Sequence, residues 1–170
     1  MAKKEAPETY TISLLTSNSV GVSNTQHTIK PLPYSNVNNV TWTVNYDELF
    51  HGRQELFEFC RVRFQLISFA NVIHNNAYGI ISTNLPSSFQ NETGNGTYLG
   101  AIFNDRNPLS TTTGAYFQNG FNDIGVDINH KQLSGVQPLN IQLRRANGAF
   151  ITGLTGLNYV LELYFELYNV

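Results

Sequence analysis

The run Tyr159-Val160-Leu161-Glu162-Leu163-Tyr164-Phe165-Glu166-Leu167 decides the fold class of this 170-residue chain. Every second residue, starting from the tyrosine, is a large apolar one, whereas the residues between them are mixed and include two glutamates. Side chains alternate between the faces of a strand, while a helix would scatter these residues around its circumference. The run therefore predicts a strand with one apolar and one wetter face. It ends three residues before the end of the sequence, and we expect it to lie inside a sheet.

The composition favours short strands and a neutral surface. Charged residues make up only 13% of the chain, against roughly 25% in typical soluble domains. Asn, Thr, Ser, Gly, Tyr and Phe take their place, a mixture that suits strands joined by turns. A surface with little charge loses little hydration on contact with another protein, so this composition favours assembly.

Length and charge bound the classes of protein that the chain can belong to. We predict a flexible N-terminal arm at residues 1–9 and a single domain at residues 10–170, a length that builds a core without metal or disulfide. The net charge of −2 and the scattered Lys and Arg residues argue against direct nucleic acid binding. The arm itself is nearly neutral. No apolar run approaches a membrane span or a signal peptide, so we expect folding in a reducing compartment.

Alternating apolar residues and turn signals divide the chain into about eight strands. One helical turn is expected within residues 46–53, ended by Gly52, and Asn147-Gly148 is the strongest turn signal. A further short strand is possible around residues 26–29. The sequence thus predicts an all-β fold, an eight-stranded antiparallel jelly-roll sandwich with at most one short helical turn. The expected strands are residues 10–15, 41–46, 57–69, 78–82, 98–103, 121–128, 139–144 and 159–167.

A search for catalytic or metal-binding patterns yields no candidate residues. The four histidines, His27, His51, His74 and His130, lack any metal-ligand spacing. Cys60 lies on the apolar face of its strand, where a buried inert thiol is expected. Glu162 and Glu166 share a strand face at roughly 13 Å, too far apart for a glycosidase pair. We therefore predict no catalytic, cofactor-binding or metal residues and no enzyme activity.

Three segments together resemble the single jelly-roll capsid proteins of double-stranded DNA viruses, of the penton and minor capsid type found in giant viruses and virophages. The segments are Thr41–Phe50 (TWTVNYDELF), Cys60–Leu66 (CRVRFQL), and Leu139–Arg144 running through Asn147-Gly148 to Tyr159–Glu166. In that family a strand ending in an Asp-Gly or Asn-Gly turn is followed by a final amphipathic strand. The family has no catalytic residues to transfer to this sequence.

The resemblance implies a structural capsid protein that self-assembles, as a pentamer or trimer, or docks onto other capsid proteins in an icosahedral shell. It implies a place in the virion after synthesis in the host cytoplasm. The alternative is a carbohydrate- or receptor-binding sandwich, possibly a trimeric head, although Trp42 alternates within a strand and is expected to be buried. A third reading, a sandwich hydrolase or cupin, requires carboxylates or metal ligands that converge from separate strands.

Overall fold

The computed structural model describes residues 5–15, 28–29, 39–68, 78–86, 97–104, 117–118, 125–144, 147–150 and 159–170. Within these ranges the chain forms strands, one α-helical turn and two 3-10 turns. In chain order they are β1 (Glu8–Leu15), β2 (Thr28–Ile29), β3 (Asn39–Asn45), α1 (Tyr46–Leu49), η1 (Gln54–Leu56), β4 (Phe59–Ser68), β5 (Tyr78–Thr83), β6 (Thr97–Asn104), β7 (Phe117–Gln118), β8 (Val126–Ile128), η2 (His130–Gln132), β9 (Val136–Arg144) and β10 (Tyr159–Tyr168).

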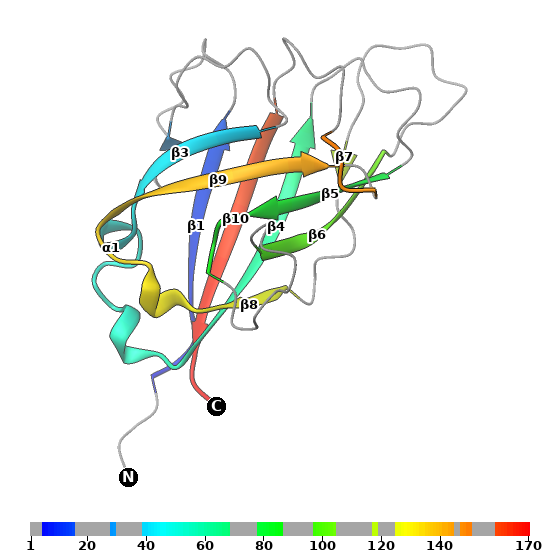
Figure 1. Cartoon of the computed structure of the whole chain (residues 1–170). Coiled ribbons are helices and arrows are strands. Elements are labelled where there is room, and N and C mark those ends of the chain that lie inside the picture. Colours follow the sequence, from blue (N-terminus) through cyan, green and yellow to red (C-terminus); the bar gives the residue numbers. More distant parts are fainter. Residues whose placement is uncertain are drawn as a thin grey trace.

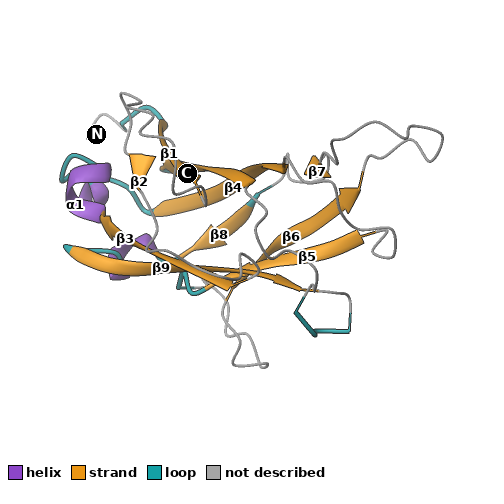
Figure 2. Ribbon diagram, turned by 90° about the horizontal axis from the view of Figure 1, so that it is seen from above, coloured by secondary structure: helices purple, strands orange, loops and turns teal. Residues whose placement is uncertain are grey.

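The strands form two sheets that face each other (Figures 1 and 2). Their orders are β2-β1-β10-β4-β8 and β3-β9-β5-β6-β7, so a two-residue strand, β2 or β7, lies at one edge of each. The remaining eight strands are paired antiparallel, four in each sheet, whereas β2 runs parallel to β1. The predicted eight-stranded antiparallel sandwich is therefore confirmed.

The pairing of these eight strands is nested from the outside of the chain inward. The first pairs with the last (β1 with β10), then β3 with β9, β4 with β8, and β5 with β6. Two further pairs, β10 with β4 and β9 with β5, complete the two sheets. The chain is thus one long antiparallel hairpin rolled into two layers, which is the jelly-roll arrangement.

The core lies between the two sheets and is built from the alternation read in the sequence. In β10 the inward residues Leu161, Leu163, Phe165 and Leu167 are fully buried. Leu163 stands level with Ile12 of β1 and Phe64 of β4, which are buried too. Trp42 of β3 is 1% exposed, so its predicted burial is confirmed. Each inward row therefore meets apolar partners on the neighbouring strands.

The helical turn α1 is fixed by its flanking residues. The side chain of Asn45 accepts a hydrogen bond from the N–H of Glu48 at 3.3 Å and caps the start of the turn. Gly52, with a φ of 67°, donates its N–H to the carbonyl of Asp47 at 2.9 Å and ends it, as predicted. The turns η1 and η2 were not predicted, because three residues are too few to show a helical period.

The observed strands differ from the predicted ones mainly at their ends. β9 begins at Val136, three residues earlier than predicted, and includes Pro138. Proline lacks an N–H, but the pairing of β9 with β5 starts only at Ile141, so Pro138 has a strand partner on one side alone. β1 begins at Glu8, within the segment predicted as an arm. Among the described residues, no helix is long and apolar enough to cross a membrane.

The central position of Leu163 yields a first prediction. Leu163→Ala should lower the free energy of unfolding by about 2–5 kcal/mol, because a cavity would open between three strands. Thr11→Val, an outward residue on the neighbouring strand β1, should change it by less than about 0.5 kcal/mol. Equilibrium unfolding in urea measures both values. Equal losses in the two variants would contradict the assigned core.

Candidate interaction surfaces

The outer side of the β1-β10-β4-β8 layer carries a set of paired charges, here named the ion-paired face. Arg63 of β4 binds Glu166 of β10 at 2.6 Å, and Arg61 binds Asp127 of β8 at 3.3 Å. Arg61 and Asp127 are directly opposite in the strand register, whereas Arg63 reaches diagonally to Glu166. The face consists of Thr11, Arg61, Arg63, Asp127, Glu162, Tyr164, Glu166 and Tyr168.

The tyrosines of the ion-paired face complete this set of contacts. Tyr164 donates a hydrogen bond to the carboxylate of Glu162. Partial burial, followed by that carboxylate, raises the pKa of Tyr164 to about 12, so its hydroxyl stays protonated. The ring of Tyr168 stacks on that of Phe59, with the two ring centroids 5.4 Å apart. The centroid of the Tyr168 ring also lies 5.3 Å from the guanidinium carbon of Arg61. Both tyrosines are half-buried, and each contacts a charged side chain of this face.

Gly125 allows Arg61 to lie along the sheet. It has a φ of 72°, and a Cβ built on it would stand 2.5 Å from Cγ of Arg61 and 3.0 Å from the carbonyl oxygen of Val62. A side chain there would collide with the arginine stem and with the backbone of β4. The close approach of the segment before β8 to Arg61 therefore requires glycine.

The outer side of the other layer is different, because its two long strands β3 and β9 present no charged side chain over most of their length. We name this surface the neutral face; it consists of Asn39, Thr41, Thr43, Asn45, Val136, Pro138, Asn140 and Gln142. The amide of Asn140 donates to Oδ1 of Asn39 at 2.8 Å and to Oγ1 of Thr41 at 2.9 Å. These bonds join the two strands across the face.

Arg144 closes one end of the neutral face. Its Nε donates to the side-chain oxygen of Gln142 at 2.9 Å, and its Nη1 donates to the carbonyl of Gly148 at 2.6 Å. The guanidinium carbon also lies 4.2 Å from the ring centre of Phe150. Arg144 thus holds the predicted Asn147-Gly148 turn, which the structure confirms through the φ of 84° at the glycine.

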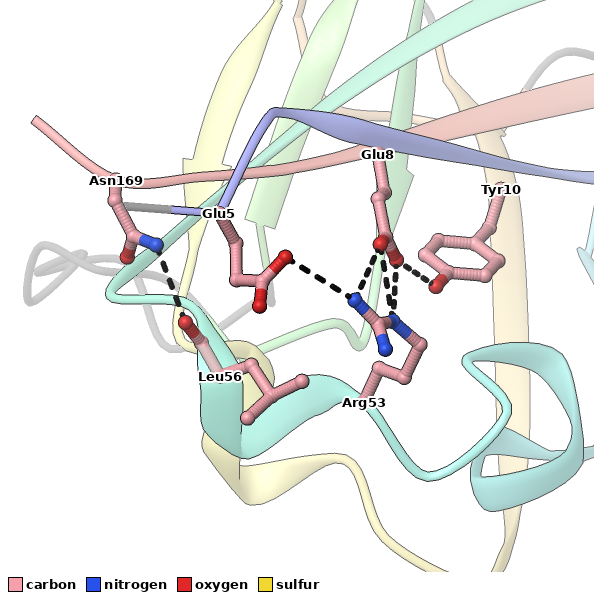
Figure 3. A network of polar contacts seen from close by, with 6 residues as sticks. All are labelled: Glu5, Glu8, Tyr10, Arg53, Leu56 and Asn169. Atoms are coloured by element: carbon pink, nitrogen blue, oxygen red, sulfur yellow. Dashed lines mark hydrogen bonds and ion pairs between the residues drawn. The ribbon is translucent and has the colours of Figure 1, made fainter. Parts of the chain in front are cut away.

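A cluster of polar contacts, here named the terminal clasp, fixes the start of β1 and the end of β10 (Figure 3). Arg53, in the loop after α1, contacts the carboxylate of Glu8 at 2.6 Å and that of Glu5 at 3.7 Å. The hydrogen bond from Arg53, and then that from Tyr10, lowers the pKa of Glu8. At the same end, Asn169 donates to the carbonyl of Leu56 at 3.1 Å and accepts from the N–H of Glu58 at 2.9 Å.

His130 occupies a buried corner where η1 meets η2. It is 1% exposed, and its Nε2 lies 3.1 Å from the carbonyl oxygen of Gln54, to which it donates. Burial lowers the pKa of this histidine. Gln54 is buried as well and donates to the carboxylate of Asp47 at 3.1 Å. Of the other histidines, His51 is exposed, whereas His27 and His74 lie outside the described residues.

The residues screened in the sequence for catalysis do not come together where the structure describes them. Cys60 is 1% exposed, and burial raises the pKa of its thiol, as expected for an inert core residue. Glu162 and Glu166 each have a partner on the ion-paired face. Within the described part of the chain, no three His, Cys, Asp or Glu side chains gather to hold a metal ion.

No protein-family model matches the chain, and no curated protein matches it in sequence.

The packing of Gly125 gives a second prediction. Gly125→Ala and Gly148→Ala should each cost about 1–2 kcal/mol, because both positions have a left-handed backbone. Gly125→Ala should cost clearly more, since Arg61 must move, whereas a Cβ at Gly148 meets nothing within 4 Å. Thermal and urea unfolding of the two variants measure the difference. A smaller loss in Gly125→Ala than in Gly148→Ala would show that Arg61 does not lie against this glycine.

The buried His130 gives a third prediction, on the pH dependence of stability. The pKa of His130 in the folded chain lies below its ordinary value of 6.5. As the pH falls past 6.5 the unfolded chain therefore binds a proton first, so stability declines until the folded pKa is reached. The decline contributed by this group is at most about 1.4 kcal/mol per pH unit.

Two variants isolate that contribution. His130→Gln should flatten the pH dependence of the unfolding free energy as the pH falls below 6.5, even if the variant is less stable at neutral pH. The exposed His51→Asn, at a position with a φ of 51° that asparagine tolerates, should retain the decline. An unchanged slope in His130→Gln would refute a buried neutral histidine.

Proposed function

We propose that the chain is a structural viral capsid protein, of the penton or minor capsid type, which associates with copies of itself or with other capsid proteins in an icosahedral shell. The jelly-roll nesting of β1 with β10, β3 with β9, β4 with β8 and β5 with β6 carries this proposal. It is the arrangement that the resemblance to single jelly-roll capsid proteins implies. Jelly rolls also occur in lectins and cupins, so the fold alone is not sufficient.

The filled interior supports an assembly role over ligand binding between the sheets. The inward residues of β3, β4 and β10 that have described side chains are apolar and buried, and so are those of β9 except the half-buried Gln137 near its start. A lipocalin-like barrel instead encloses a ligand, and a cupin-like protein places metal-binding groups in its interior. Contacts with other molecules are therefore expected at the outer faces, the ends and the loops of this sandwich.

The pairing of cations supports a shell role over binding of the genome. The described Arg and Lys residues are Arg53, Arg61, Arg63, Lys131 and Arg144. The first four lie within 4 Å of a carboxylate, and Arg144 is bound to Gln142 and to the backbone of Gly148. Phosphate binding needs cations that are free to replace counterions. These five are engaged within the chain.

The test of this proposal is the mass of the purified protein in solution. Light scattering after size exclusion, repeated over a wide range of concentration, should show a discrete pentamer or larger closed particles, and electron microscopy should show rings or shells. A protein that stays monomeric at the highest concentration, and that binds glycans on an array, would refute the proposal in favour of a carbohydrate-binding module. A trimer that binds glycans would favour a receptor-binding head.

A further inference from the structure

We infer that the neutral face is a self-association surface, on which the outward residues of β3 and β9 contact a second copy of this chain. The inference deepens the proposed capsid function and rests on it, because it names the surface through which copies meet. That the partner is a second copy of this chain follows from the charge, the polar groups and the exposed residues of the two outer faces.

The distribution of charge separates the two outer faces. The ion-paired face carries Arg61, Arg63, Asp127, Glu162 and Glu166, and a contact across it would remove five charged groups of each copy from water. Desolvation of charges is unfavourable even when they are paired, and interface cores are depleted of them. The eight residues of the neutral face include no charged side chain. A protein surface therefore meets the neutral face at the lower cost.

The same charge argument favours a second copy as the partner. In a contact with two-fold symmetry, a surface patch lies against itself, so any net charge on the patch repels its own image. The neutral face has no net charge, and the cation that the structure describes at its end, Arg144, is bound to Gln142 and to the carbonyl of Gly148. Asparagine, glutamine and threonine side chains both donate and accept hydrogen bonds, so such a patch complements itself.

The face is also ordered before contact and offers exposed apolar atoms. Asn140 holds the side chains of Asn39 and Thr41 by hydrogen bonds, so little side-chain freedom is lost when a partner arrives. Val136, 65% exposed, and the exposed Pro138 stand at the start of β9 beside Asn45 and Thr43. Val136 and Pro138 supply the apolar contact that Asn39, Thr41 and Asn140 do not.

The size of the face predicts a weak contact. Seven residues of β3 at about 3.4 Å, and the two strands β3 and β9 at about 4.8 Å each, give roughly 24 by 10 Å, or about 240 Å² in projection. Stable interfaces bury about 800 Å² on each partner. Isolated pairs should therefore associate only at high concentration, with a dissociation constant in the micromolar range or above.

The test introduces one carboxylate on each face, in two separate variants. Thr43 on the neutral face and Thr11 on the ion-paired face are both outward residues of a strand. Thr43→Glu should weaken self-association by at least about tenfold, because an unpaired carboxylate would be buried in the contact. Thr11→Glu should leave the association constant within about twofold, and Thr43→Val should retain association. Sedimentation velocity over a concentration series gives the constants, and circular dichroism confirms that each variant is folded.

The outcomes separate this inference from the proposed function. If the wild-type chain does not associate at all, the inference is refuted, and of the proposed capsid function only docking onto other capsid proteins is left. If the wild type associates and Thr43→Glu associates equally well, the neutral face is refuted while the capsid function stands. If only Thr11→Glu loses association, the ion-paired face is the contact instead, and the inference is refuted. Loss in Thr43→Glu alone supports it.

Discussion

The register of β10 between β1 and β4 is the constraint on which the rest of the molecule depends. β10 is paired with β4 from Tyr159 to Tyr168 and with β1 over almost the same length. A slip of one residue would turn Leu163 and Phe165 outward and bring Glu162 and Glu166 into the core. Because buried carboxylates without partners are very unfavourable, only one register is compatible with a packed sandwich. The same register sets the heights of β1 and β4.

The ion-paired face follows from that register. Once Leu163 stands level with Phe64, Glu166 is brought opposite Arg61 and within reach of Arg63. β8 then joins β4 so that Asp127 lies opposite Arg61. In this register, Arg61 and Arg63 each lie within 4 Å of a carboxylate. The alternation that builds the core therefore also neutralises the charges on the outside.

Much of the fold was predictable from the sequence because alternation is a local signal. It identified β3, β4 and β10 to within two residues at each end and assigned Trp42, Cys60 and Leu163 to the core. The contacts at the end of the sandwich were not predictable. Arg53 and Glu8 are 45 residues apart, and His130 and Gln54 are 76 apart. They meet only because the nested strands bring separate connections together, and nothing in their own segments marks the partner. Nothing in the residues around His130 therefore marked this histidine as buried.

The division of charge between the two faces would suit so weakly charged a chain to the proposed shell. Its net charge of −2 creates little long-range repulsion between copies. The charged residues of the sandwich faces are concentrated on one layer, which leaves the other layer available for contact. A contact of about 240 Å² is too small to hold two copies firmly. In the proposed shell, however, each copy would be held by several neighbours at once, and linked contacts act together far more strongly than one alone. A small neutral surface would then allow single pairs to separate while the complete assembly persists.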